Sequence, residues 1–185
     1  MGGKEKLLFG TALSVVLPEN AKDVSGIRDI PDNQEVFCHP VTDQSFIIEL
    51  LEFVDGTDEE AIKTHFEDLA SCNEASASAQ IIRVEEIPVQ QTSMGECTSV
   101  WQLSGRQNVA KFHDTAENIV NVHMGVIRLT EYRTDIVITF NDPVLISPES
   151  SSYAPIPTSA GPWQVEDFHK AVTSLQLLDP GIFSD

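Results

Sequence analysis

The sequence has few basic residues for its length. Eleven Lys and Arg stand against 29 Asp and Glu in 185 residues, which gives a formal net charge of -18. Nucleic acids and anionic membrane surfaces attract proteins through Lys and Arg, so this charge balance argues against both as partners. A basic surface on another protein is the partner that such a chain attracts. Acidity that serves only solubility is the alternative explanation.

Features of secreted and membrane proteins are also missing. The three cysteines, Cys38, Cys72 and Cys97, cannot all pair within one chain, and no Asn-X-Ser/Thr sequon occurs. No apolar run approaches the ~20 residues of a membrane span. Leu7-Leu8-Phe9 is too short for the apolar core of a signal peptide. We therefore expect a protein of the nucleus and cytoplasm that does not insert into a membrane.

Motifs of catalysis are absent as well. The chain has no P-loop, no dinucleotide-binding glycine turn, no nucleophile elbow and no zinc-binding H-E-x-x-H. Cys38 and His39 are adjacent, and neighbours on a strand point to opposite faces, so they are not expected to act as nucleophile and base. We expect no enzymatic activity of its own, no cofactor and no metal site.

Hydrophobic patterns predict strands separated by two amphipathic helices. The first helix is expected over 57–70, where Thr57 and Glu60 form a capping box, with His65 as a hydrogen-bonded histidine at the core boundary. The second is expected from Pro162 and is stopped by Pro180-Gly181, with a buried stripe of Val165, Phe168, Val172 and Leu175. Strands are expected at 7–17, 35–38, 45–54, 80–87, 98–103, 119–129 and 134–140, and a short helix is possible at 24–28.

Consecutive strands with short connections predict an antiparallel sheet, and two helices must cover it. We therefore predict an α+β layered fold in one domain, residues 1–185. The Pro- and Ser-rich segment 142–161 is expected to be a surface loop. Trp101 and Trp163 are expected to anchor the core, although either could be a binding hot spot.

Acidic residues are concentrated in the first 74 residues. Fourteen of the 29 acids lie in segments 19–35 and 46–74, together with only three basic residues. Helix capping accounts for Asp58 to Glu60. Glu49 and Glu52 are different, because burial and strand propensity both disfavour carboxylates within the apolar run 45–54. A helix with a narrow polar stripe is the alternative for this run; on a regular strand the two acids point to opposite faces.

Several blocks of the sequence resemble the Mog1 family of Ran-binding proteins. The blocks occur in the same order over nearly the whole chain: Phe9-Gly10, Pro31-Asp32-Asn33-Gln34-Glu35-Val36-Phe37, Glu49-Leu50-Leu51-Glu52, His65-Phe66-Glu67-Asp68, Arg128-Leu129, Thr134-Asp135, Leu178-Asp179 and Phe183. The resemblance implies an antiparallel sheet of about six strands flanked by helices, similar to the photosystem PsbP proteins. It also implies that the chain binds the GTPase Ran, promotes release of its guanine nucleotide and takes part in nuclear transport.

The resemblance further implies which residues bind Ran. Glu49 and Glu52 match the acidic strand that serves Ran binding in the family. Four further candidates fall in matching segments, namely Asp23, Asp32, Glu35 and Asp43.

Two other functions are kept as alternatives. One is a trafficking adaptor in which the same acidic face binds a cytoplasmic loop of the cardiac-type sodium channel, at the cell membrane, a role associated with vertebrate members of the family. The other is a small-ligand carrier on a PsbP-like scaffold, because fold alone does not fix function.

Overall fold

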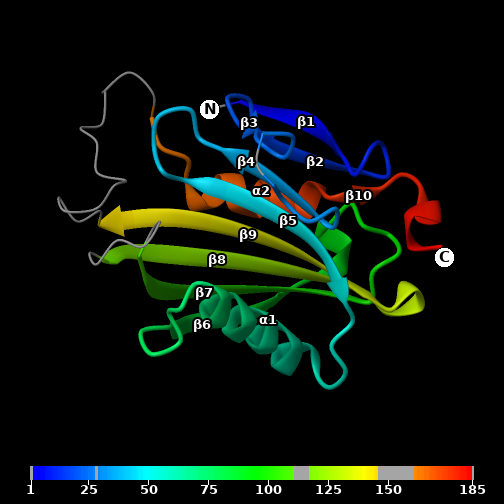
Figure 1. Ribbon diagram of the computed structural model, residues 1–185. Coiled ribbons are helices and arrows are strands. Elements are labelled where there is room, and N and C mark those ends of the chain that lie inside the picture. The colour runs from blue at the N-terminus through cyan, green and yellow to red at the C-terminus, as the bar shows by residue number, and fades with distance from the viewer. Residues whose placement is uncertain (1, 28, 111–116, 146–160, 185) are drawn as a thin grey trace.

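A computed structural model describes residues 2–27, 29–110, 117–145 and 161–184. Figure 1 shows a large twisted sheet with a helix on each side. Helix α1 covers one face, and helix α2 lies with a smaller sheet on the other. No helix in these ranges is long and apolar enough to cross a membrane.

All strand pairs are antiparallel. The larger sheet has seven strands in the order β3 (Lys22–Asp23), β4 (Gln34–Cys38), β5 (Ser45–Glu52), β9 (Thr134–Leu145), β8 (Glu117–Leu129), β7 (Ser99–Ala110) and β6 (Gln80–Ile87). The smaller sheet consists of β1 (Gly3–Leu8), β2 (Leu13–Pro18) and β10 (Gln176–Leu177). Within the described ranges, the helices are α1 (Asp58–Cys72), α2 (Val165–Ser174) and three short 3-10 turns, η1 (Val89–Gln91), η2 (Thr130–Tyr132) and η3 (Pro180–Phe183).

Two glycines let the helices approach the central strands from opposite faces. A Cβ at Gly105 on β7 would lie 2.7 Å from the ring of Phe66 on α1, and one at Gly125 on β8 would lie 2.6 Å from Val172 on α2. The core is accordingly divided into two clusters, one under each helix. The predicted α+β fold with an antiparallel sheet is confirmed, with seven strands in the larger sheet rather than about six.

Several local predictions are confirmed. Strand β6 has the predicted bounds, and the ambiguous apolar run forms a strand, β5. Thr57 caps α1 in a complete capping box with Glu60. His65 is buried and hydrogen-bonded, and Trp163 is a core residue with 2% of its surface exposed.

The prediction of one strand over 7–17 is wrong. The chain turns at Phe9 and Gly10, which have positive φ of 52° and 76°, so the run forms the β1–β2 hairpin of the smaller sheet. Gly10 supplied the signal, since glycine adopts this conformation without steric cost. The described part of the possible helix at 24–28 is not helical, since Ser25 to Ile27 form a turn.

The second helix and the strands before it also differ from expectation. Helix α2 begins at Val165 rather than at Pro162, and it ends at Ser174, before strand β10, rather than at Pro180-Gly181. Val165 is 48% exposed instead of buried. Strands β7 and β9 extend beyond their apolar runs, so residues 142–145 of the predicted loop belong to β9. Long antiparallel pairing with β8 stabilises these polar extensions. Residues 146–160 of that loop lie outside the described ranges.

A buried ionic cluster joins the sheet to α1. Arg128 on β8 and Asp135 on β9 are cross-strand partners, 1% and 0% exposed, with 3.4 Å between the Arg Nε and the Asp Oδ1. The same arginine lies 3.4 Å from Asp58 at the start of α1, and His65 Nε2 lies 2.8 Å from Asp135 Oδ2. We call these four residues the Arg128 cluster.

Arg128→Met should lower the free energy of unfolding by about 3–5 kcal/mol, because it leaves the Asp135 carboxylate buried without its partner. Lys63→Met is the matched control: its pair with Glu59 is exposed, so its loss should cost less than about 1 kcal/mol. Urea denaturation of both variants measures this difference. Equal stabilities would contradict a structural role for the cluster.

Candidate functional site: the acidic end of strand β5

Strand β5 extends beyond its neighbour β4 at one end. The last paired residues are Gln34 and Glu49, and two further hydrogen bonds join Leu50 to Asn33: Leu50 N donates to Asn33 O at 2.9 Å, and Asn33 Nδ2 donates to Leu50 O at 3.0 Å. Leu51 and Glu52 therefore continue along β9 with a free edge on the β4 side. The chain then passes through a short connection into α1. We call the acids of this region, Glu49, Glu52, Asp55 and Asp58, the acidic end of β5.

Glu49 is a half-buried member of this group. Its Oε2 accepts a hydrogen bond of 2.7 Å from Gln34 Nε2. Burial raises the pKa of Glu49, while the Gln34 amide and the charge of His65 act in the opposite direction. The carboxylate is thus held in place at an energetic cost, as expected for an acid kept within an apolar strand.

Glu52 is the exposed last residue of β5. Among the described residues its side chain has no hydrogen bond or ion pair, whereas Asp55 Oδ1 lies 3.0 Å from Arg133 Nη2 and Asp58 contacts Arg128. Pairing of β5 with both neighbours is regular, so Glu49 and Glu52 do point to opposite faces, as a regular strand requires. Glu52 is therefore the member of this group whose charge is open to a partner.

The Arg128 cluster fixes the connection that follows Glu52. Arg128 Nη2 donates to Val54 O, and Val54 N donates to Asp135 Oδ2 at 3.0 Å. The Phe53 ring contacts two guanidinium groups, with the Cζ atoms of Arg128 and Arg133 at 4.0 and 4.8 Å from its ring centre. Arg128, Asp135 and Phe53 were not among the site residues predicted from the sequence, although a charged arginine and aspartate within apolar strands were a signal.

Two of the remaining candidates do not join this group. The backbone of Glu35 pairs with Ile48, next to Glu49, but its side chain is engaged elsewhere. Glu35 accepts a hydrogen bond of 2.6 Å from Phe9 N and so holds the β1–β2 turn. Burial has the largest effect on the pKa of Glu35 and raises it, the Phe9 N–H lowers it, and the charge of Asp23 raises it to a smaller extent. Asp43 lies in the β4–β5 hairpin, at the opposite end of β5.

Asp32 and Asp23 are exposed. Asp32 belongs to the turn before β4, beside the free edge of β5. Asp23 ends β3, and its Oδ1 accepts a hydrogen bond from Ser25 N at 2.9 Å. Strand pairing therefore places Asp32 and Glu35 beside the Glu49 end of β5, and of these two only Asp32 is exposed.

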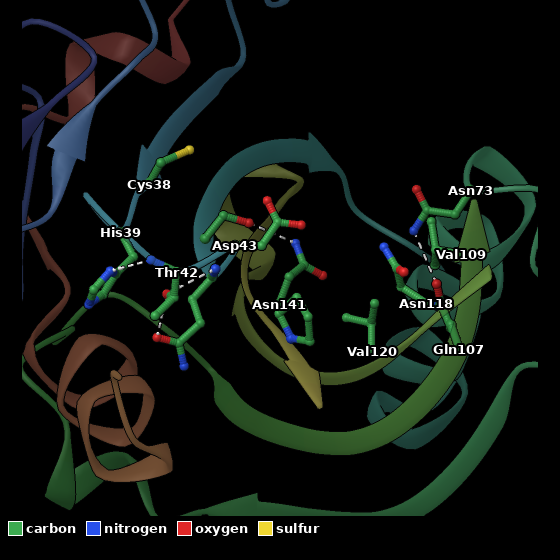
Figure 2. Close-up of a pocket in the computed structure, with 13 residues that line it drawn as sticks. Cys38, His39, Thr42, Asp43, Asn73, Gln107, Val109, Asn118, Val120 and Asn141 are labelled. Carbon is green, nitrogen blue, oxygen red and sulfur yellow. Dashed lines mark hydrogen bonds between the residues drawn. The ribbon is translucent and has the colours of Figure 1, made fainter. Parts of the chain in front are cut away.

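A polar pocket of about 440 Å³ occupies the opposite end of β5 (Figure 2). Carboxamides line it, among them Asn73 and Gln107, which are joined by a hydrogen bond of 3.0 Å. His39 is fully engaged, because its Nδ1 accepts from two backbone N–H groups and its Nε2 lies 3.0 Å from Gly161 O. This histidine is not available as a general base. The described side chains form no group of three or more metal ligands.

Residues 6–143 match the family described as "Ran-interacting Mog1 protein". The chain belongs to the Mog1 family. It is 50% identical over 179 residues to the "Ran guanine nucleotide release factor" of Danio rerio, covering 95% of this chain and 97% of the relative. It is 33% identical over 158 residues to the "Nuclear import protein MOG1" of Saccharomyces cerevisiae, covering 78% and 68%. The fold matches the crystal structure of the Saccharomyces cerevisiae Ran-binding protein Mog1p with a TM-score of 0.72, 24% identity and full coverage of both chains.

Glu49→Gln should stabilise the protein at pH 7, because it removes a partly buried charge while its Oε1 can still accept from Gln34. The raised pKa of Glu49 means that the folded state holds its proton to a higher pH than the unfolded chain. Stability of the natural protein therefore falls as pH rises through this window, and the advantage of the variant should disappear at pH 4. We expect a gain of about 1–3 °C in Tm at pH 7, allowing for partial solvent screening. A lower Tm at pH 7 would contradict this account.

Proposed function

We propose that this protein binds the GTPase Ran through the acidic end of β5 and promotes release of its guanine nucleotide. The observation that carries the proposal is the open carboxylate of Glu52 at an exposed strand end, within a group of acids that a buried cluster holds in place. The names of the relatives support Ran as the partner and nucleotide release as the activity. The name "Nuclear import protein MOG1" of the Saccharomyces cerevisiae relative supports action in the nucleus and cytoplasm.

Nucleotide release requires a difference in affinity. The protein must bind nucleotide-free Ran more tightly than loaded Ran, since a ligand with equal affinity for both shifts nothing. Carboxylates can produce this difference if they bind basic side chains that otherwise contact the phosphates. A net charge of -18 also favours rapid encounter with such a basic surface. The protein then needs no catalytic centre of its own.

The two alternatives have less support. No described contact and none of the relatives' names points to a sodium channel, so the adaptor role stays a prediction. The pocket of Figure 2 is a candidate binding site for the carrier hypothesis. However, its His39 already contacts Gly161 O, and the side-chain amides of Asn73 and Gln107 are hydrogen-bonded to each other.

Release of a fluorescent GTP analogue from Ran, followed by stopped flow, tests the proposed activity. A molar excess of this protein should accelerate release, and the acceleration should fall as salt rises because the interaction is between charged surfaces. Release at the intrinsic rate at all concentrations and at low salt would contradict the proposal.

Glu52→Lys should weaken binding to nucleotide-free Ran by roughly tenfold or more, mainly through the association rate, because it reverses an exposed charge at the interface. Glu67→Lys is the matched control, since Glu67 is an exposed acid on the outer face of α1. Surface plasmon resonance of both variants distinguishes a local effect from the change in net charge. Equal losses for both variants would place the interface elsewhere.

A further inference from the structure

A shallow pocket of about 280 Å³ adjoins Glu52. Its wall combines residues that lie far apart in the sequence. They are Leu50 and Glu52 from β5, Arg133 from the β8–β9 connection, and Ile182 and Phe183 from the C-terminal turn η3. We call it the Glu52 pocket. Figure 1 shows the C-terminal turn in red beside the end of the large sheet.

The C-terminal turn is a fixed part of the fold. Asp179 Oδ1 accepts a hydrogen bond of 2.9 Å from Gly181 N, and Leu178 N donates to Ala12 O at 2.8 Å. Phe183 stacks on Tyr132 with 4.9 Å between ring centres. Ile182 and Phe183 also pack against the main core. The apolar wall is thus formed before any partner arrives, which lowers the entropy cost of binding.

The charges of the pocket favour a cation. Arg133 lines it, but its guanidinium pairs with Asp55 at 3.0 Å and lies over the Phe53 ring. Glu52 has no such partner among the described residues. The pocket therefore presents one open carboxylate next to an aliphatic and aromatic wall. Lysine and arginine side chains fit this combination, because a long apolar stem carries their charge.

We propose that the Glu52 pocket receives one lysine or arginine side chain of Ran, and that η3 belongs to the partner-binding surface. The apolar stem lies along Leu50, Ile182 and Phe183, and the charged group pairs with Glu52. The aromatic ring of Phe183 adds a cation-binding face to the wall. This inference rests on the proposed function, since it names the chemistry of the same partner.

Affinity for nucleotide-free Ran tests the pocket with the full-length chain. Ile182→Ser should weaken binding about fivefold to twentyfold, the range expected when an apolar contact is lost from an interface anchor. Leu178→Ser is the matched control, because Leu178 is 46% exposed in the same segment but does not line the pocket. Its affinity should stay within about twofold of the natural protein.

A pair of charge variants keeps the test independent of folding. Ser184 is exposed and lines the pocket. Ser184→Glu should tighten binding about threefold, and Ser184→Lys should weaken it by a similar factor, as expected for single charges at the rim of an interface. Tighter binding cannot result from partial unfolding.

The outcomes distinguish failure of the pocket proposal from failure of the proposed function. If Glu52→Lys weakens binding but the changes at Ile182 and Ser184 do not, the pocket proposal is wrong and Ran binding by the acidic end of β5 stands. Equal losses for Ile182→Ser and Leu178→Ser would also overturn the pocket, because the effect would belong to the whole C-terminal segment. Absence of Ran binding by the natural protein would overturn the proposed function itself.

Discussion

The buried ion pair between Arg128 and Asp135 is the interaction on which the candidate site depends. It joins two central strands, and hydrogen bonds from it fix Val54 just after β5. His65 and Asp58 connect the same pair to α1. Buried ion pairs contribute little net stability but tolerate few alternative arrangements. Its role here is to determine where β5 ends and how the acidic connection to α1 is held.

The acids at this end divide into two kinds. Asp55 and Asp58 are paired with arginines, and Glu49 is half-buried with a hydrogen bond from Gln34. Glu52 alone of the four lacks a described partner. Because most of the other charges in this group are paired or partly buried, Glu52 is the acid that can form a new ion pair with a partner. A partner with a basic surface is attracted by the total charge and is then oriented by Glu52 and the apolar wall beside it.

Much of the fold could be predicted from the sequence, because its signals are local. The capping box at Thr57, the β-branched runs and the spacing of apolar residues predict α1 and most strands, and the resemblance to Mog1 proteins supplies the layer order. The β1–β2 hairpin was missed because Leu7 to Leu17 is apolar on both sides of Gly10. The polar ends of β7 and β9 are stabilised by strand pairing, which no local pattern reveals.

The candidate site could be predicted only in part, because some of its contacts join residues that are distant in the sequence. Glu49 and Glu52 are unusual within an apolar strand, so the sequence singles them out. Glu35 resembles them in charge, but its contact with Phe9 crosses 26 residues and gives it a structural role. The contribution of Ile182 and Phe183 depends on the docking of the C-terminal turn beside β5, more than 120 residues away. Such juxtapositions follow from tertiary structure alone.

Hydrogen–deuterium exchange of this protein with and without nucleotide-free Ran tests the central claim most directly. The account predicts slower exchange in residues 50–57 and 180–184 when Ran is bound, and unchanged exchange in the edge strand β6. Protection of β6 or of the β4–β5 hairpin, with residues 50–57 unaffected, would contradict it.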